Sequence, residues 1–283
     1  MGKISIVTDS TAYIPKDYLD RYGIYVVPTI LNWGSKMYRD GVDITPTEFF
    51  ERMKTDPVHP TTSVPSIGEF REVYAKAAQN AEAVVGVHLS AKLSGTFSAA
   101  EQAVAMIPDK TIKVVDSNST AMALGFVVLA AARAAAAGKP LDQVVQAAHG
   151  AIPHTGVVLT VETLEYLRRG GRIGGAQAFI GGLLDAKPIL ELRDGRIEPL
   201  ERVRTKKKAM QRLVEIVVER IKGQTPLRLA TLHAAAQEDA AAILVSVKAQ
   251  LGSVEEAILS EVSPTIATHT GPGTVGLAYC AGI

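Results

Sequence analysis

The first half of the chain alternates short apolar runs with segments in which apolar residues recur at helical spacing. This alternation is typical of strand–helix–strand units and predicts an α/β protein. Residues 57–66, rich in Pro, Thr and Ser, are expected to form a loop. The expected strands cover residues 4–7, 25–31, 83–89 and 112–115, and the expected helices cover 46–53, 69–81, 96–106 and an alanine-rich segment from 121.

The second half has a different pattern. Asp194-Gly195 lies between two apolar runs and predicts a hairpin turn. Because the pattern changes near Ile152-Pro153, we expect two α/β domains, 1–153 with a largely parallel sheet and 154–283 with a mixed sheet and helices. The expected strands are 156–161, 188–192, 197–203, 227–232 and 257–261, and the expected helices are 164–168, 207–221 and 238–251.

Composition and charge narrow the function classes. Of 283 residues, 47% are hydrophobic and 21% are charged, which is ordinary for a globular protein. The net charge of +1 gives no support for a general nucleic-acid binder. The most apolar stretch, 121–132, is too short to span a bilayer, and Asp9 interrupts the N-terminus before any signal-length run. Cys280 is the single cysteine and cannot form an internal disulfide, so a cytoplasmic location is expected.

Standard catalytic motifs are absent from the sequence. It contains no phosphate-binding P-loop, no His-Glu-x-x-His motif and no Gly-x-Ser-x-Gly nucleophile turn. The glycines of 170–175 suggest a dinucleotide loop, but they follow an expected helix rather than a strand. None of the six histidines pairs closely with carboxylates at metal-ligand spacing. Neither a metal nor a cofactor is therefore expected.

Four turns that bear hydroxyl side chains follow or flank the expected strands of the first half. Ligands of parallel α/β sheets bind beyond the carboxyl ends of the strands, and Ser94 also opens a helix, where free N–H groups attract anions. This pattern suits a small anion such as a carboxylate, although helix caps and Ser/Thr turns explain it equally well. The turns are Asp9-Ser10-Thr11, Thr61-Thr62-Ser63, residues 90–96 and Asp116-Ser117.

A set of short motifs, in a specific order over nearly the whole chain, closely resembles the DegV family of bacterial fatty acid-binding proteins that serve fatty acid kinase. One departure is Val64, where the family usually has Gln. The motifs are Val7-Thr8-Asp9-Ser10-Thr11, Thr62-Ser63-Val64-Pro65-Ser66, Leu93-Ser94-Gly95-Thr96, Val115-Asp116-Ser117, residues 164–173, Lys187-Pro188-Ile189-Leu190, residues 203–208 and His269-Thr270-Gly271-Pro272-Gly273.

The resemblance implies that a long-chain fatty acid such as palmitate, stearate or oleate lies between the two domains. Thr62 and Ser94 would bind its carboxylate, with His269 close by and Thr61 and Ser63 beside Thr62. The tail would enter the second domain, where residues 176–184 are either its pocket or ordinary core packing.

The resemblance also implies a partner. A separate ATP-binding kinase subunit would phosphorylate the bound carboxylate to an acyl phosphate for phospholipid metabolism, so this chain would be a carrier and not an enzyme. Arg172 and Arg204 would meet that subunit, unless they only belong to a solvated face. Lys206 to Lys208 begin an expected helix, where the dipole disfavours cations, which suggests a use beyond stability. A transient contact with a membrane is also compatible with this role.

Two other function classes stay open. One is a hydrolase in which Ser94 and His269 act with Asp9 or Asp116, although nothing in the spacing brings these residues together. The other is a module that binds a different small acid or a phosphosugar.

Overall fold

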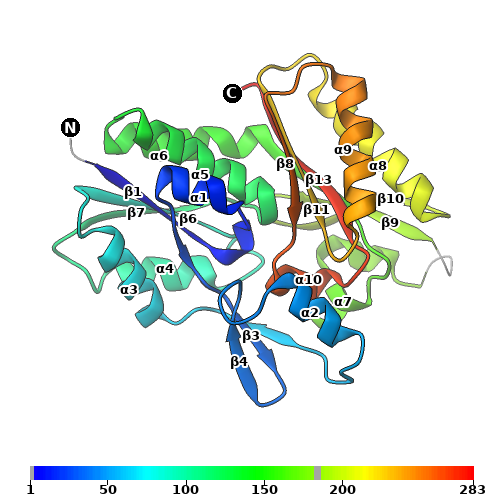
Figure 1. Ribbon diagram of the computed structural model, residues 1–283, viewed down its shortest axis with the longest axis horizontal. Helices are drawn as coiled ribbons and strands as arrows, with labels where there is room; N and C mark the ends of the chain where they lie inside the picture. Colours follow the sequence, from blue (N-terminus) through cyan, green and yellow to red (C-terminus); the bar gives the residue numbers. More distant parts are fainter. Residues whose placement is uncertain (1–2, 182–185) are drawn as a thin grey trace.

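The computed structural model describes residues 3–181 and 186–283, and its first half is built on a parallel sheet (Figure 1). The strand order is β2-β1-β6-β7, and all pairings are parallel. The predicted parallel α/β architecture of this half is therefore confirmed. The strands are β1 (Ile4–Asp9), β2 (Tyr25–Val27), β6 (Ala83–His88) and β7 (Thr111–Asp116).

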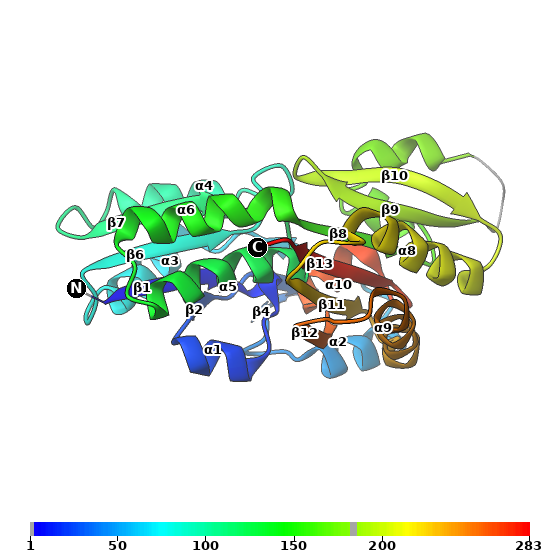
Figure 2. The same cartoon turned by 90° about the horizontal axis from the view of Figure 1, so that it is seen from above.

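Helices cover both faces of this sheet (Figure 2). Because side chains alternate along a strand, Val84 packs under one helix layer and Val85 under the other. The first layer is α3 (Ile67–Ala77) with α4 (Thr96–Val104), and the second is α5 (Ala121–Ala136) with α6 (Leu141–Ala151). The short helix α1 (Lys16–Tyr22) packs beside α5.

The second half forms a mixed sheet with the order β10-β9-β8-β13-β11-β12. Helices α8 (Lys206–Ile221) and α9 (Gln237–Leu251) cover one face, as the 3.6-residue pattern predicts. The strands are β8 (Thr155–Thr160), β9 (Lys187–Arg193), β10 (Arg196–Val203), β11 (Leu227–His233), β12 (Glu256–Glu261) and β13 (Val275–Ala281).

Helix α5 lies between the two large sheets. Its side chains belong to one hydrophobic core that includes Ile6 and Val85 of the first sheet and Val157 and Ala278 of the second. This explains why α5 is buried on nearly every face. The six-stranded sheet begins at Thr155, close to the predicted boundary at 153, but the shared core means that the division into two domains remains a proposal.

The single strand expected over 25–31 is in fact two strands, because the chain leaves the first sheet at Pro28. Pro28 has no backbone N–H, and that of Thr29 is bonded to the Ser10 hydroxyl at 3.0 Å instead of to a strand. The chain then forms β3 (Ile30–Trp33), which pairs with β4 (Lys36–Arg39) and β5 (Thr61–Ser63) in a small antiparallel sheet. Residues 57–66, expected to be a loop, therefore contain a strand.

Other elements were missed or displaced. The pattern gave no sign of α6, α10 (Pro264–Thr270) or β13, although β13 is paired on both sides by β8 and β11. Helix α3 begins at Ile67 and not Glu69, because Ser66 and Glu69 form a capping box. The expected helices α2 (Pro46–Met53), with Thr45 as its cap, and α7 (Glu165–Arg169) are present.

The interpretation of the basic helix start at Lys206 also changes. Its ammonium group lies 3.0 Å from a Glu162 carboxylate oxygen and 2.8 Å from one of Asp239. Lys206 thus joins α8 to α9 and to the end of β8, which accounts for a cation at this place without a partner. In the described part of the chain, no helix has both the length and the apolar character needed to cross a bilayer.

Candidate ligand-binding site

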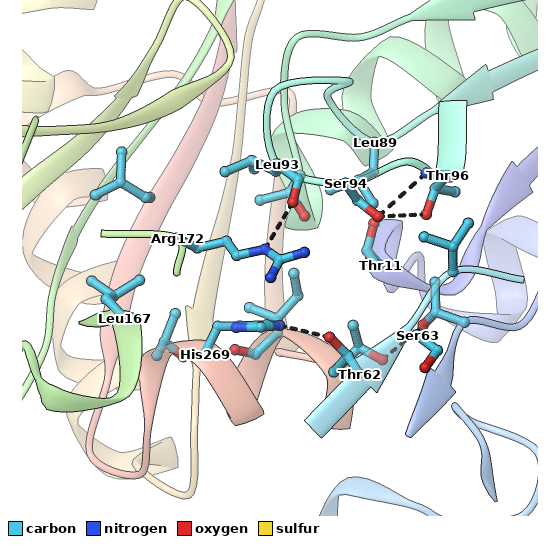
Figure 3. A pocket seen from close by; sticks show the side chains of 17 residues that line it. Thr11, Thr62, Ser63, Leu89, Leu93, Ser94, Thr96, Leu167, Arg172 and His269 are labelled. Atoms are coloured by element: carbon cyan, nitrogen blue, oxygen red, sulfur yellow. Dashed lines mark hydrogen bonds between the residues drawn. The ribbon is translucent and has the colours of Figure 1, made fainter. Parts of the chain in front are cut away.

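A pocket lies between the two halves of the chain, beyond the carboxyl ends of β1 and β6 (Figure 3). Its empty volume, including the open mouth, is about 660 Å³. The first half contributes Thr11, Thr29, Thr62, Ser63, Val64, Leu89, Leu93, Ser94, Thr96 and Thr120, and the second half contributes Leu167, Arg172, Ile197, Thr265, Ile266, His269 and Thr270.

Thr62 and His269 meet across this pocket. Thr62 lies on β5, where it is paired with Leu31 of β3. His269 lies near the end of α10. The Thr62 Oγ1 and His269 Nε2 atoms are 2.8 Å apart, within hydrogen-bond distance. The two residues are 207 positions apart in sequence, so this contact joins the two halves at the pocket.

The surroundings keep the His269 imidazole neutral. Burial, and then the nearby Arg172 guanidinium, lower the pKa of His269 from 6.5 to about 4. Its Nδ1 atom is buried without a hydrogen-bond partner in the described residues. A bare nitrogen costs less there than an unpaired N–H, so we assign the proton to Nε2, which donates to Thr62 Oγ1. The Thr62 hydroxyl hydrogen is then free to donate to a ligand.

Gly170 packs directly against the His269 imidazole ring. A methyl group added at Gly170 would lie 2.0 Å from His269 Nδ1, closer than any normal contact. The backbone of Gly170 has φ −74°, which any residue adopts, so glycine is required here for space and not for conformation.

Ser94 lies in the turn that precedes α4. Its hydroxyl is 2.9 Å from that of Thr96 and accepts a hydrogen bond from the Thr96 backbone N–H at 3.3 Å. Ser94 therefore forms a Ser/Thr turn, and this is compatible with a role in ligand binding, because the same oxygen closes the turn and lines the pocket.

Arg172, for which the sequence predicts a docking role, lines the pocket. Its Nε donates to the carbonyl of Leu93 at 2.9 Å and its Nη1 to that of Gly170 at 2.7 Å, which holds the guanidinium in the pocket wall (Figure 3). The hydroxyl pattern in the sequence points only to neutral groups at the site. The docking role of Arg172 stays a prediction, and its position adds a cation to the ligand site.

The remaining predicted site residues lie in different surroundings. Ser63 lines the pocket, and its hydroxyl accepts a hydrogen bond from Asn32 Nδ2 at 2.7 Å. Thr61 is exposed and lines a neighbouring cavity together with Thr62. Arg204 is exposed and outside the pocket lining, so its docking role also stays a prediction.

Sequence reasoning missed a second hydroxyl pair in the pocket. The hydroxyl oxygens of Thr29 and Thr265 are 2.7 Å apart and join the two halves a second time. Behind them the Asp40 carboxylate accepts hydrogen bonds from Ser10 and Thr29, each at 3.0 Å. Thr29 follows Pro28 and was missed because residues 25–31 were expected to form one continuous strand.

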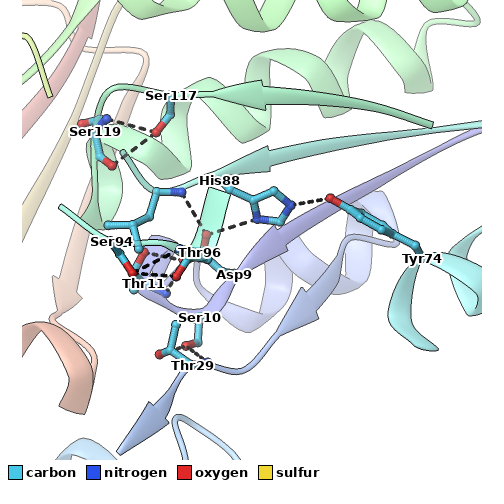
Figure 4. Close-up of polar contacts among 11 residues, drawn as sticks. Asp9, Ser10, Thr11, Thr29, Tyr74, His88, Ser94, Thr96, Ser117 and Ser119 are labelled. Atoms are coloured by element: carbon cyan, nitrogen blue, oxygen red, sulfur yellow. Dashed lines mark hydrogen bonds and ion pairs between the residues drawn. The ribbon is translucent and has the colours of Figure 1, made fainter. Parts of the chain in front are cut away.

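Asp9 holds the floor of the pocket in place (Figure 4). It accepts hydrogen bonds from the backbone and hydroxyl of Thr11 at 3.1 and 2.5 Å, and from the Leu89 backbone at 2.9 Å. On its other side His88 Nδ1 is 3.2 Å away, and His88 Nε2 lies 2.8 Å from the Tyr74 hydroxyl. The hydroxyl-bearing turn after β1 is therefore fixed by a fully buried chain of polar groups.

This arrangement does not favour the hydrolase. Asp9 is bonded to His88 and Thr11, and Asp116 to the backbone of Ala91 and Asn118, so neither orients His269. His269 in turn is bonded to Thr62, and Ser94 to Thr96. Over residues 3–181 and 186–283, no three or more His, Cys, Asp and Glu side chains are placed to hold a metal ion.

The stability of the ligand-free protein should fall as the pH is lowered from about 7 to about 4. In this window the unfolded chain takes up a proton on His269 that the folded protein does not, because the folded pKa is about 4 against 6.5. The loss is on the order of 3 kcal/mol. Denaturant unfolding of the wild type and of His269→Gln at several pH values measures it. The free energy of unfolding of the wild type, relative to that of His269→Gln, should decrease toward low pH. If the two free energies change in parallel with pH, the lowered pKa of His269 is refuted.

Comparison with known proteins agrees with this architecture. The sequence model of a family described as uncharacterised proteins of the DegV family matches residues 3–282. The chain belongs to the DegV family. It is 43% identical, over 276 residues, to a DegV domain-containing protein of Streptomyces coelicolor, and this match covers 97% of each chain.

Solved structures of DegV proteins have the same fold. One, described as fatty acid binding of a DegV family protein from Thermus thermophilus, is 39% identical with a TM-score of 0.93, and the match covers 99% of both chains. Another, described as DegV, a fatty acid binding protein from Bacillus subtilis, is 35% identical with a TM-score of 0.90, covering 99% of this chain and 100% of that one. The resemblance and the fold class predicted from the motifs are thus confirmed.

Proposed function

We propose that this DegV-family chain binds a long-chain fatty acid and holds its carboxylate at Thr62, Ser94 and His269. The observation that carries the proposal is the pocket between the two halves, where the Thr62–His269 pair and Ser94 face walls made of Leu89, Leu93, Leu167, Ile197 and Ile266. Two relatives of the same fold are described as fatty acid-binding.

The polar end of the pocket suits one carboxylate. The hydroxyls of Thr62 and Ser94 are neutral donors, so they orient a carboxylate oxygen while leaving its lone pairs available. Arg172 supplies the positive charge that a buried anion requires. No carboxylate lies within salt-bridge distance of Arg172 in the described residues, so an anionic ligand would be its counter-charge.

The apolar end suits an alkyl chain. Leu167 and Ile197 line the pocket and also belong to a small hydrophobic cluster with Leu159, Ile173 and Leu190 beneath the 3₁₀ segment Gly174–Phe179. A sixteen-carbon acid has about fourteen methylenes, worth about 11 kcal/mol gross at roughly 0.8 kcal/mol each. Of the predicted tail region 176–184, residues 182–184 lie outside the described residues.

We further propose that the chain is a carrier and that a separate ATP-dependent kinase subunit phosphorylates the carboxylate, within the cytoplasm and toward phospholipid synthesis. The absence of a P-loop from the sequence supports this division of labour. Arg204, exposed at the start of α8, and Arg172 remain the proposed docking residues.

The protein should purify with a long-chain acid, and palmitate should raise the melting temperature of the delipidated protein. A ligand that binds only the folded state stabilises it by mass action. Mass spectrometry of extracted lipid and thermal unfolding with palmitate measure this, and hexadecanol is the control because it has the same tail without the charge. If no acid is extracted and palmitate leaves the melting temperature unchanged, the proposal fails.

A further inference from the structure

A second cavity lies on the other side of the Thr62–His269 pair. Thr62, Arg172 and His269 line both the ligand pocket and this cavity, so these three side chains form a partition between them. The empty volume of the cavity, including its mouth, is about 680 Å³. Its other walls are Met53, His59, Pro60, Thr61, Tyr166, Arg169, Gly170 and Thr268.

The cavity is cationic and open to solvent. Arg169 and Arg172 both line it, and its lining contains no Asp or Glu. The outer residues His59, Thr61 and Arg169 are exposed, whereas Thr268 at the inner end is buried. An anion entering from solvent would therefore meet the Arg169 guanidinium first and then that of Arg172 at the partition itself.

Arg169 is pre-positioned at this mouth. Its Nε donates to a Glu165 carboxylate oxygen at 2.6 Å, and its Nη1 donates to His59 Nε2. The His59 ring packs edge-on against the Tyr166 ring, with centroids 6.2 Å apart. Within the described residues the Nη2 groups of Arg169 and Arg172 have no hydrogen-bond partner, so both arginines keep donors for a ligand.

We propose that this cavity is the subsite for the phosphoryl group of the acyl phosphate, and the side from which the nucleoside triphosphate approaches. The inference rests on the proposed function. A carboxylate oxygen attacks the γ-phosphorus, an O–P bond forms, and the bond to the leaving nucleoside diphosphate breaks with its electron pair. A carboxylate held at Thr62 and His269 presents an oxygen at the partition, and Arg169 and Arg172 would stabilise the charge of the transferred group.

The test uses the full chain and two ligands that differ only in the phosphoryl end. One is palmitate, and the other is the stable analogue in which palmitoyl is joined through a methylene group to a phosphonate. Arg169→Gln should weaken binding of the phosphonate about 10-fold or more, because it removes a charge-assisted contact, while palmitate affinity changes less than about twofold. Arg169→Lys should restore part of the phosphonate affinity.

Arg168→Gln is the matched control. Arg168 is the adjacent arginine on α7 and bonds the same Glu165, but it does not line the cavity. Calorimetry measures the affinity of each variant for both ligands. Only Arg169→Gln should lose affinity, and only for the phosphonate. Equal phosphonate affinity in the wild type, Arg169→Gln and Arg168→Gln, with palmitate bound normally, would overturn the subsite alone. A wild type that binds neither ligand would overturn the proposed function and the subsite together.

Discussion

Replacing Thr62 by Val and Ser94 by Ala together should lower acyl-phosphate formation about 100-fold or more. The double variant removes two hydroxyls from the polar end of the pocket, and hydrogen bonds to a charged acceptor are worth roughly 1.5–3 kcal/mol each. The alkyl chain keeps its apolar contacts, so lipid binding should fall less than turnover. Phosphate transfer to bound palmitate by an ATP-dependent fatty acid kinase subunit measures the effect.

The control for this pair is Ser98→Ala. Ser98 is an exposed hydroxyl of α4, two residues beyond Thr96, and it does not line the pocket. Ser98→Ala should transfer phosphate at the wild-type rate, and both proteins should unfold within a few degrees of the wild type. Wild-type turnover in the double variant would show that the carboxylate is held elsewhere.

Gly170→Ala should lower palmitate affinity by at least about 10-fold, although the ligand does not need to touch residue 170. The new methyl group would lie 2.0 Å from His269 Nδ1, so the imidazole must move and lose its contact with Thr62. Overpacking of this kind also destabilises by about 1–3 kcal/mol. Palmitate titration and thermal unfolding measure the two effects.

Gly150→Ala and a double variant serve as controls for this prediction. Gly150 lies in α6, and a methyl group added there meets nothing within 4 Å. Combining Gly170→Ala with His269→Ala should recover stability without recovering affinity, because the clash disappears and so does the imidazole. A Gly170→Ala protein that binds palmitate as the wild type does would refute this role of His269.

The fold was predictable wherever local pattern and tertiary position agree. The hairpin of β9 and β10 and the helices α8 and α9 follow from turn chemistry and helical spacing. Strand β13 was missed because Gly276 and its small neighbours give a weak strand pattern, while pairing on both sides decides its structure. The separate strand β3 was not predicted, because the break at Pro28 depends on a tertiary contact: the Ser10 hydroxyl accepts the hydrogen bond of the Thr29 N–H in place of a strand partner.

The candidate site divides in the same way. Thr62, Ser94 and His269 could be named because motifs carry them, and the structure brings them to one pocket. Thr29 and Thr265 carry no motif, and only the meeting of the segment between β2 and β3 with the first turn of α10, 236 residues apart, shows that they form a pair. The docking role of Arg172 stays a prediction, but nothing in the sequence indicated that its bonds to Leu93 and Gly170 would place it in the lining of the pocket.

Helix α5 acts as a spacer. Half of its residues are alanine, and Gly125 has no room for a methyl group, which would lie 2.9 Å from Met122 Sδ and 3.2 Å from Ile14. The thickness of this one helix therefore sets the separation of the two large sheets, because closely packed interiors transmit added volume. Thr120, its N-cap residue, lines the pocket. The gap open to the ligand is thus governed by buried alanines that never touch it, and enlarging one of them should alter which acyl chains fit.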